Sequence, residues 1–301
     1  MATITTSQMV DTLDANMNEL FLDGIERYKD EYSVVFNVKD STKQTEQDSY
    51  LSGFGLMPIK PEGQDASYDT VRPGIVETYT HDTYAMGYEI TEEAVEDNLQ
   101  APGTFNRFPE LLKKSAMETI EVTAFNVFNN GFSTNGFDGT TLFSTSHPTL
   151  DGGTMSNRPS TDADLSVTSL TAGLTAFEDF TDERGLKRPT KAAKVLVPTA
   201  LWNVIIELLD SPYKPNTANN EVNALQEKDL SYMVGHYLTD TDAWFILALK
   251  DDTALKFFWR VRLGDLKRGT DFDSTNLKHL ARMRFSLGYS YHGGTYGTRG
   301  A

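Results

Sequence analysis

One helical pattern, spanning residues 107–129, constrains the fold of this chain more than any other stretch. Pro109 and Glu110 stand in its first turn, and Asn129-Asn130-Gly131 supplies an ending. A helix of this length is about 35 Å long, so we expect it to form the spine of a domain, with Ile120 in the core and Glu121 on the polar face. Two apolar rows share its buried side: Phe108, Leu112, Ala116, Ile120, Ala124 and Val127, and Leu111, Met117, Phe125 and Phe128.

Composition excludes several classes of protein. The 301 residues contain no cysteine, which rules out disulfides and thiolate metal sites. The first residues carry neither a basic start nor an apolar segment, so we expect no signal peptide. Apolar runs stay shorter than the roughly 18 residues of a membrane helix, so no membrane partner is predicted.

The negative charge is concentrated in the first third of the chain. The formal charge is −16; residues 1–100 carry 20 acidic and 6 basic side chains, whereas residues 201–301 carry 12 of each. This asymmetry suits a segment that lies on another surface, and it equally suits a solubilising acidic face. It argues against specific nucleic-acid binding, which needs clustered Lys and Arg.

The segments before the long helix read as extended. A modest helix is expected over residues 8–31, a short strand over 33–38 and a short acidic helix over 91–98. Residues 50–59 and 75–90 read as strands joined by a polar, Pro/Gly-rich stretch. Such a long hairpin is marginal alone in water, so we expect it to rest on something outside its own domain; two strands of an ordinary sheet remain the alternative.

The segments after the long helix read as a mixed α/β body. Helices are expected over residues 166–183 and 200–210, and strands over 194–198, 232–237, 243–249, 255–263 and 277–292. In the last strand Lys278, Arg282 and Arg284 share one parity, which places them on one face. The Gly-rich C-terminal tail reads as small and flexible.

Catalytic motifs are missing from the sequence. It has no phosphate-binding glycine loop and no G-x-S-x-G elbow. None of the five histidines follows another at metal-ligand spacing, and the Asp271–Thr275 stretch lacks the glycine and glutamate of a calcium loop. We therefore expect no enzyme, no cofactor and no metal site.

A series of motifs in the second half resembles tailed-phage major capsid proteins, most closely the major head subunit family of Mu-like phages. Their order and spacing carry the resemblance, which is strongest over residues 104–301. The motifs are F-S-T-S-H-P, G-G-T-M-S-N, V-L-V-P-T-A-L-W, N-N-E-V-N-A, W-F-I-L-A-L-K-D-D and G-G-T-Y-G-T-R-G.

The resemblance implies an α+β chain with the Hong Kong 97-like phage capsid fold. The implied parts are an N-terminal arm (1–47), an extended E-loop hairpin (48–98), a P-domain spine helix (99–136), an α/β A-domain (137–262) and P-domain return strands with the C-terminal tail (263–301). Among the assembly residues, the helix supplies Phe108, Leu112, Ile120 and Phe125. The acidic first third would match Lys278, Arg282 and Arg284 of a neighbour. Lys60 lies at the hairpin tip, where some relatives cross-link, but no motif supports that bond here.

The implied function is structural. Hexamers and pentamers of the chain would form an icosahedral shell around double-stranded DNA without binding it specifically. The expected partners are a portal protein, a separate scaffolding protein and, in some heads, a decoration protein. Assembly would take place in the bacterial cytoplasm, and the product would be the virion capsid. An encapsulin-like compartment shell and an uncharacterised hydrolase are the alternatives.

Overall fold

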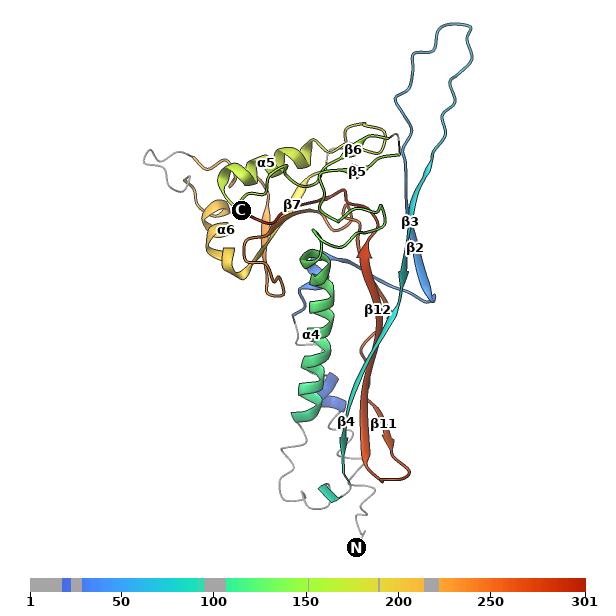
Figure 1. Ribbon diagram of the computed structural model, residues 1–301, viewed down its shortest axis with the longest axis vertical. Helices are drawn as coiled ribbons and strands as arrows, with labels where there is room; N and C mark the ends of the chain where they lie inside the picture. Colours follow the sequence, from blue (N-terminus) through green and yellow to red (C-terminus); the bar gives the residue numbers. More distant parts are fainter. Residues whose placement is uncertain are drawn as a thin grey trace.

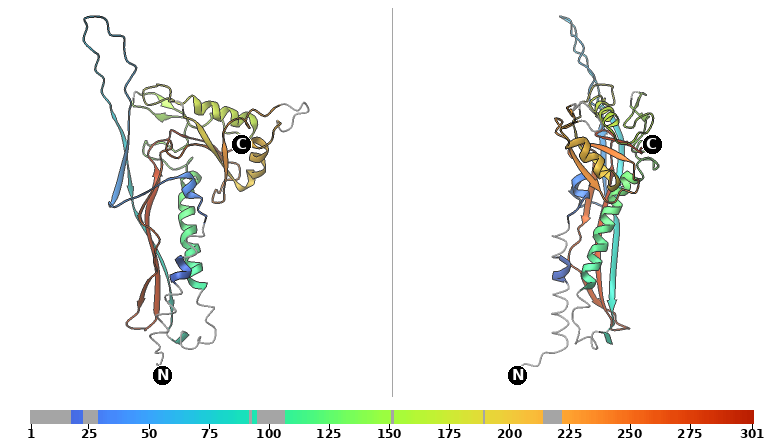
Figure 2. Two further views of the ribbon diagram at one scale, coloured as in Figure 1. Left: turned by 180° about the vertical axis from the view of Figure 1, so that it is seen from behind. Right: turned by 90° about the vertical axis from the view of Figure 1, so that its left-hand side faces the viewer.

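The computed structural model describes residues 18–22, 29–91, 93–94, 107–150, 152–188, 190–213 and 222–301. In this part of the chain, a long helix and a long sheet form an elongated body, a broader body lies at one end of it, and a hairpin projects beyond both (Figures 1 and 2). Of the helix expected at 8–31, residues 18–22 are helical, residues 29–31 are not, and the rest lies outside the described residues. Most of the helix expected at 91–98 also lies outside them. Among the described helices, none is long and apolar enough to cross a membrane.

The elongated body contains a mixed sheet centred on β12 (Leu277–Tyr289). Three strands pair with β12, and all run antiparallel to it. β4 (Asp82–Ile90) and β11 (Lys267–Thr270) flank its first part, and β10 (Leu255–Val261) pairs with its last part. The first strand, β1 (Asn37–Asp40), extends the sheet parallel to β10. The sequence predicted the long last strand, and β12 confirms it over thirteen of the expected residues.

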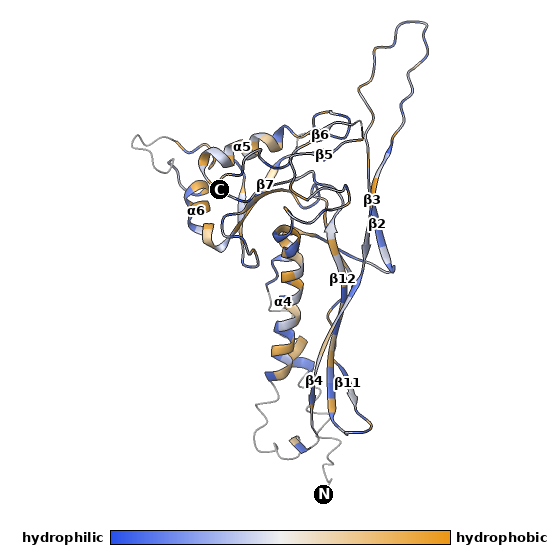
Figure 3. Cartoon of the chain, viewed as in Figure 1, coloured by the Kyte–Doolittle hydropathy of each residue, from blue (hydrophilic) through white to orange (hydrophobic). Residues whose placement is uncertain are grey.

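Helix α4 (Arg107–Asn129) runs along one face of this sheet, and its bounds confirm the predicted spine. Apolar residues recur along it (Figure 3). Ile120, Phe125 and Phe128 are at most 2% exposed and pack with Phe257 of β10 and Phe285 of β12. Burying each such side chain contributes about 1.5–3 kcal/mol, so this face holds the helix on the sheet. Leu111, which the sequence placed in the second apolar row, is instead 63% exposed.

Glu121 corrects the expected polar face of α4. Its side chain is 1% exposed, and it accepts hydrogen bonds from the backbone N–H groups of Glu31 (2.8 Å) and Tyr32 (3.0 Å). These groups begin α2 (Tyr32–Val35), a single helical turn. The expectation that Glu121 lies on the polar, exposed face of the helix is therefore wrong.

The broader body has a second sheet in the order β13-β9-β7-β8. Its strands are β13 (Thr295–Thr298), β9 (Trp244–Ala248), β7 (Ala192–Pro198) and β8 (Ser231–Gly235). All five residues of β9 are buried, as a central strand covered on both faces requires. Two short strands, β5 (His147–Pro148) and β6 (Thr154–Met155), pair beside it.

Helices α5 (Val167–Glu178) and α6 (Trp202–Leu209) cover one face of the second sheet. The Ser166 side chain begins α5 by accepting from the backbone of Ser169, and Ser169 bonds back to Ser166, which satisfies two free N–H groups. A short turn, η2 (Thr199–Leu201), precedes α6. Thr199, whose hydroxyl is of the kind that caps helices, lies within η2 and does not cap it.

The hairpin differs from its prediction in where its strands pair. β2 (Thr45–Leu51) pairs with β3 (Pro73–Thr80), whereas residues 53–59, expected as a strand, belong to no ladder. The second expected strand is divided at His81, because β3 stays in the hairpin and β4 joins β12. The alternative prediction, that these segments are strands of an ordinary sheet, is thus correct for β4.

Two further expectations at the ends of the chain are wrong. The strand expected at 33–38 is instead the turn α2 followed by β1, because Glu121 supplies an acceptor for the N–H groups that a helical turn leaves free. The C-terminal tail is not flexible, since all four residues of β13 are buried and pair with β9. Gly297 fits there because an added Cβ would lie 2.7 Å from the Phe143 ring.

Candidate assembly surfaces

The hairpin tip, which we define as residues 52–72, exposes large apolar side chains. Met57 and Ile59 are 97% and 95% exposed. Phe54, Leu56 and Tyr68 are exposed beside them, and so is Lys60. Soluble monomers seldom present such a contiguous apolar patch, which marks an interaction site.

A polar tether holds the lower part of the tip. Arg184 forms an ion pair with Asp69 and donates to the carbonyl of Thr70 at 2.7 Å. The same carboxylate accepts from the backbone N–H of Gly55 at 2.9 Å. The Gly55 hydrogen bond first, and then Arg184, lower the pKa of Asp69 to about 2. The two sides of the tip, at Gly55 and Asp69, are thereby linked to each other and, through Arg184, to the broader body.

The root of the hairpin is fixed more firmly. Asp48 forms an ion pair with Lys256 of β10 and accepts from Ser290. Burial opposes ionisation of Asp48, but these two partners outweigh it and hold the pKa of that carboxyl below its usual range. Nearby, the ring of Tyr50 stacks on Tyr291, with ring centroids 4.4 Å apart. The root of the hairpin is thus fixed to the subunit, while its tip stays exposed.

The basic side chains of β12 lie on the face that the sequence predicted. Lys278 and Arg282 are exposed and Arg284 is half-buried, while the alternating residues Ala281, Met283 and Phe285 are buried. Lys278 already forms an ion pair with Asp271 of the same chain, and Arg284 donates to the carbonyl of His81 at 3.3 Å. Lys278 and Arg284 therefore already have partners within the subunit.

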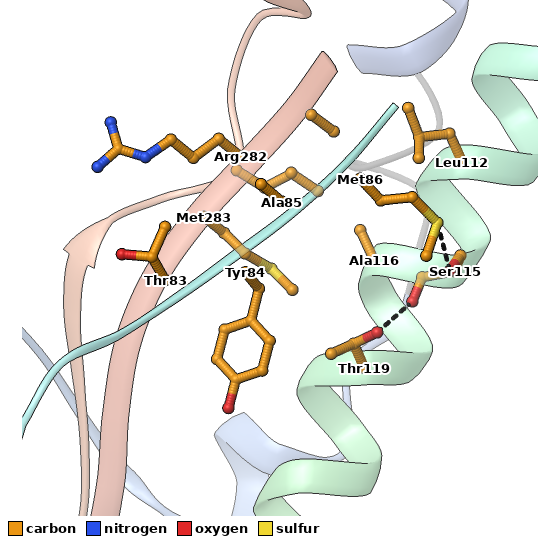
Figure 4. A pocket seen from close by; sticks show the side chains of 12 residues that line it. Thr83, Tyr84, Ala85, Met86, Leu112, Ser115, Ala116, Thr119, Arg282 and Met283 are labelled. Atoms are coloured by element: carbon orange, nitrogen blue, oxygen red, sulfur yellow. Dashed lines mark hydrogen bonds between the residues drawn. The ribbon is translucent and has the colours of Figure 1, made fainter. Parts of the chain in front are cut away.

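The helix residues singled out from the sequence are positioned inside the subunit. Leu112, Ile120 and Phe125 are buried, and Phe108 packs edge-on against Tyr88 at 5.6 Å. Between α4 and the sheet a groove of about 370 Å³ remains (Figure 4). Met86 and Leu112 line it, and the Met86 sulfur accepts a hydrogen bond from Ser115 at 3.7 Å.

A buried histidine cluster joins the broader body to the C-terminal strand, and sequence spacing did not reveal it. His147 donates from Nδ1 to Asp138 at 2.6 Å, and its Nε2 lies 3.1 Å from the Asn157 oxygen. The ring of His292 stacks on His147 with centroids 3.8 Å and planes 3° apart, and burial lowers the pKa of His292 to about 3.

These side chains bring three potential metal ligands close together, within 4.8 Å of one another. Parallel stacked rings, however, direct their nitrogen lone pairs side by side instead of toward one point. Both nitrogens of His147 also face hydrogen-bonding partners. We interpret the cluster as a structural support for β13, because Asn157 also accepts at its backbone carbonyl from Gly297 at 3.1 Å.

Several solved structures have a similar fold. The procapsid of bacteriophage JBD30 matches with a TM-score of 0.53 at 14% identity, covering 99% of this chain and 77% of that chain. Microbacterium phage Oxtober96 matches with a TM-score of 0.59 at 11% identity, covering 91% and 92%. A virus-like particle from Pyrococcus furiosus matches with a TM-score of 0.54 at 10% identity, covering 94% and 98%. The fold is thus the Hong Kong 97-like capsid fold.

The family is established by sequence. The model of the phage capsid protein family matches residues 75–289, which is most of the chain, so the protein belongs to that family. No curated protein sequence matches it at a significant level. The chain is a tailed-phage major capsid protein, and its place is the capsid of the virion.

Proposed function

We propose that the chain assembles as hexamers and pentamers into a closed icosahedral shell around double-stranded DNA. The observation that supports this most directly is the hairpin tip, since its apolar side chains are bare although its root is fixed. A neighbouring copy of the chain would cover them. Closed point-group assembly of one chain needs large, repeated contacts of this kind.

The parts of the subunit take the names of the capsid family in this proposal. Residues 1–47 are the N-terminal arm, 48–98 the E-loop, 99–136 the spine segment, 137–262 the A-domain and 263–301 the return strands. Phe108, Leu112, Ile120 and Phe125 act indirectly, by keeping the subunit rigid. Lys60, Lys278, Arg282 and Arg284 lie on surfaces that a neighbour would contact. Lys278 and Arg284 also have partners within the subunit.

The chain acts without catalysis, since its role is to enclose DNA. The portal protein, a separate scaffolding protein and a decoration protein are proposed as its partners. The bacteriophage JBD30 capsid is decorated with minor capsid protein trimers, which supports a decoration surface here. A compartment shell that holds protein cargo in place of DNA is the competing outcome.

Electron microscopy of the purified full-length chain tests the proposal. Phe54, Leu56, Met57 and Ile59, each changed to Ser, should give a folded subunit that no longer forms shells. The melting temperature should stay close to that of the wild type, because these side chains are exposed in the subunit. The matched control replaces the polar tip residues Glu62→Gln and Asp65→Asn and should assemble normally.

Three outcomes would contradict the proposal. Normal shells from the serine variant would show that the tip makes no essential contact. Wild-type shells that hold protein and exclude DNA, when isolated from infected cells, would favour the compartment. A wild-type chain that remains monomeric at every concentration would contradict both the capsid proposal and the compartment alternative.

A further inference from the structure

The segment that leads from the N-terminal arm into the first sheet is held at both ends of α2. At the start of the turn, both oxygens of the buried Glu121 accept backbone N–H groups, from Glu31 and Tyr32. At its end, Lys194 donates to the carbonyl of Val34 at 3.1 Å, and Lys250 donates to that of Ser33. Oxygen acceptors at the N-terminal end and lysine donors at the C-terminal end both match the free groups of a helical turn.

A second carboxylate connects the segment to the broader body. Glu31 accepts from the ring Nδ1 of His236 at 2.5 Å and from its backbone N–H at 3.1 Å. His236 directly follows β8. We call this set, Glu121, Glu31, His236, Lys194 and Lys250, the arm clasp. It joins residues 29–36 to α4, β7 and the loops after β8 and β9.

Closing the clasp places an aromatic ring in the core. The ring of Tyr32 packs on Phe257 at 4.7 Å and meets Trp259 at 6.5 Å. Val35 and Phe36 follow it into the same cluster and are at most 2% exposed. Opening the clasp would therefore expose apolar surface and change the point at which the arm leaves the subunit.

The charges that surround Glu121 are mixed. Burial raises the pKa of Glu121 to about 7; the two backbone hydrogen bonds oppose this shift, and the negative charges of Glu31 and Asp30 add to it. The basic side chains face other members of the clasp, since His236 bonds to Glu31 and the two lysines lie at the far end of α2. Arg262 is near Tyr32 and pairs with Asp40.

We propose that the arm clasp is a pH-responsive hold on the N-terminal arm, tight in mildly acidic solution and looser in alkaline solution. Burial of an uncharged carboxyl group favours the closed state, because ionisation adds a third negative charge beside Asp30 and Glu31. A carboxyl group whose pKa is raised from 4.5 to about 7 contributes stability that is present at low pH and is lost as the pH rises through about 7. The clasp is internal to the subunit and does not depend on the assembly proposal.

Hydrogen exchange followed by mass spectrometry, on the full-length chain at pH 5.5 and pH 8.5, tests the clasp. After correction for the intrinsic exchange rate, amides of residues 29–36 should lose protection by roughly thirtyfold at the higher pH. Amides of β9, in the core of the broader body, should change little. Equal protection of residues 29–36 at the two pH values would overturn the proposal.

Three variants distinguish the contribution of Glu121 to the pH dependence from that of His236. Glu121→Gln cannot ionise, so protection of residues 29–36 should become independent of pH, even if one N–H group loses its acceptor. Glu118→Gln, on the exposed side of the same helix, should keep the wild-type dependence. His236→Gln should also keep it. A pH dependence that persists in Glu121→Gln, or one that disappears in His236→Gln, would refute the assignment to Glu121.

Discussion

Two glutamates of α4, three positions apart, have opposite surroundings. Glu118 is half-exposed and reaches Lys114 at 3.9 Å, while Glu121 is 1% exposed and bonds to a segment ninety residues earlier in the chain. Helical periodicity treats the two alike, because it assigns every carboxylate to water. The N–H groups that make burial of Glu121 affordable come from a distant turn, so no local pattern could have predicted them.

The apolar side of α4 is a residue-scale prediction that the structure confirms for Ile120. Replacing it by Asp would leave an unpaired charge in a site that is 2% exposed, at a cost of at least about 4 kcal/mol. We expect Ile120→Asp to accumulate as insoluble or unfolded chain and to form no shells, measured by soluble yield and circular dichroism. Glu118→Gln is the matched control; a cooperatively folded Ile120→Asp subunit would show that this face is not the core.

At the scale of elements, the local signals of the long helix predicted it correctly, whereas segments that depend on distant partners were predicted wrongly. The bounds of α4 follow from Pro109 and the Asn-Gly ending, which lie inside the local sequence. The tail of Gly and Thr residues reads as a loop, yet β9 supplies its hydrogen-bond ladder from fifty residues away. The histidine cluster was missed for the same reason, since His292 lies far along the chain from His147.

The tether at the hairpin tip gives an element-scale prediction. Arg184→Ala should change the melting temperature little, because the Asp69 partner is on the surface and exposed pairs stabilise weakly. It should nevertheless free the tip, so chymotrypsin should cut at Phe54 and Tyr68 several-fold faster in the unassembled subunit. Lys187→Ala, which removes the nearby exposed pair with Asp179, is the control. Equal cleavage rates in wild type and Arg184→Ala would show that the tether does not order the tip.

At the scale of the whole molecule, the subunit is incomplete as a single copy. Among the described residues, the two largest apolar clusters are packed, whereas the tip beyond β2 and β3 joins no ladder and exposes its apolar side chains. Isolated two-stranded ribbons are marginal in water, which is why the sequence already indicated an external support. The order of motifs predicted the capsid fold, whereas the location of the surface that receives the tip depends on contacts between copies.

A folded subunit with an altered tip should interfere with shell assembly by the wild-type chain. The serine variant at Phe54, Leu56, Met57 and Ile59 keeps the surface that receives a neighbour's tip but cannot occupy one itself. Mixed with an equal amount of wild type, it should lower the yield of closed shells below that of the same wild-type concentration alone, measured by sedimentation and electron microscopy. Ile120→Asp, which should not fold, offers no such surface and should leave the yield unchanged. If the serine variant also leaves it unchanged, the tip and its receiving surface do not link neighbouring copies.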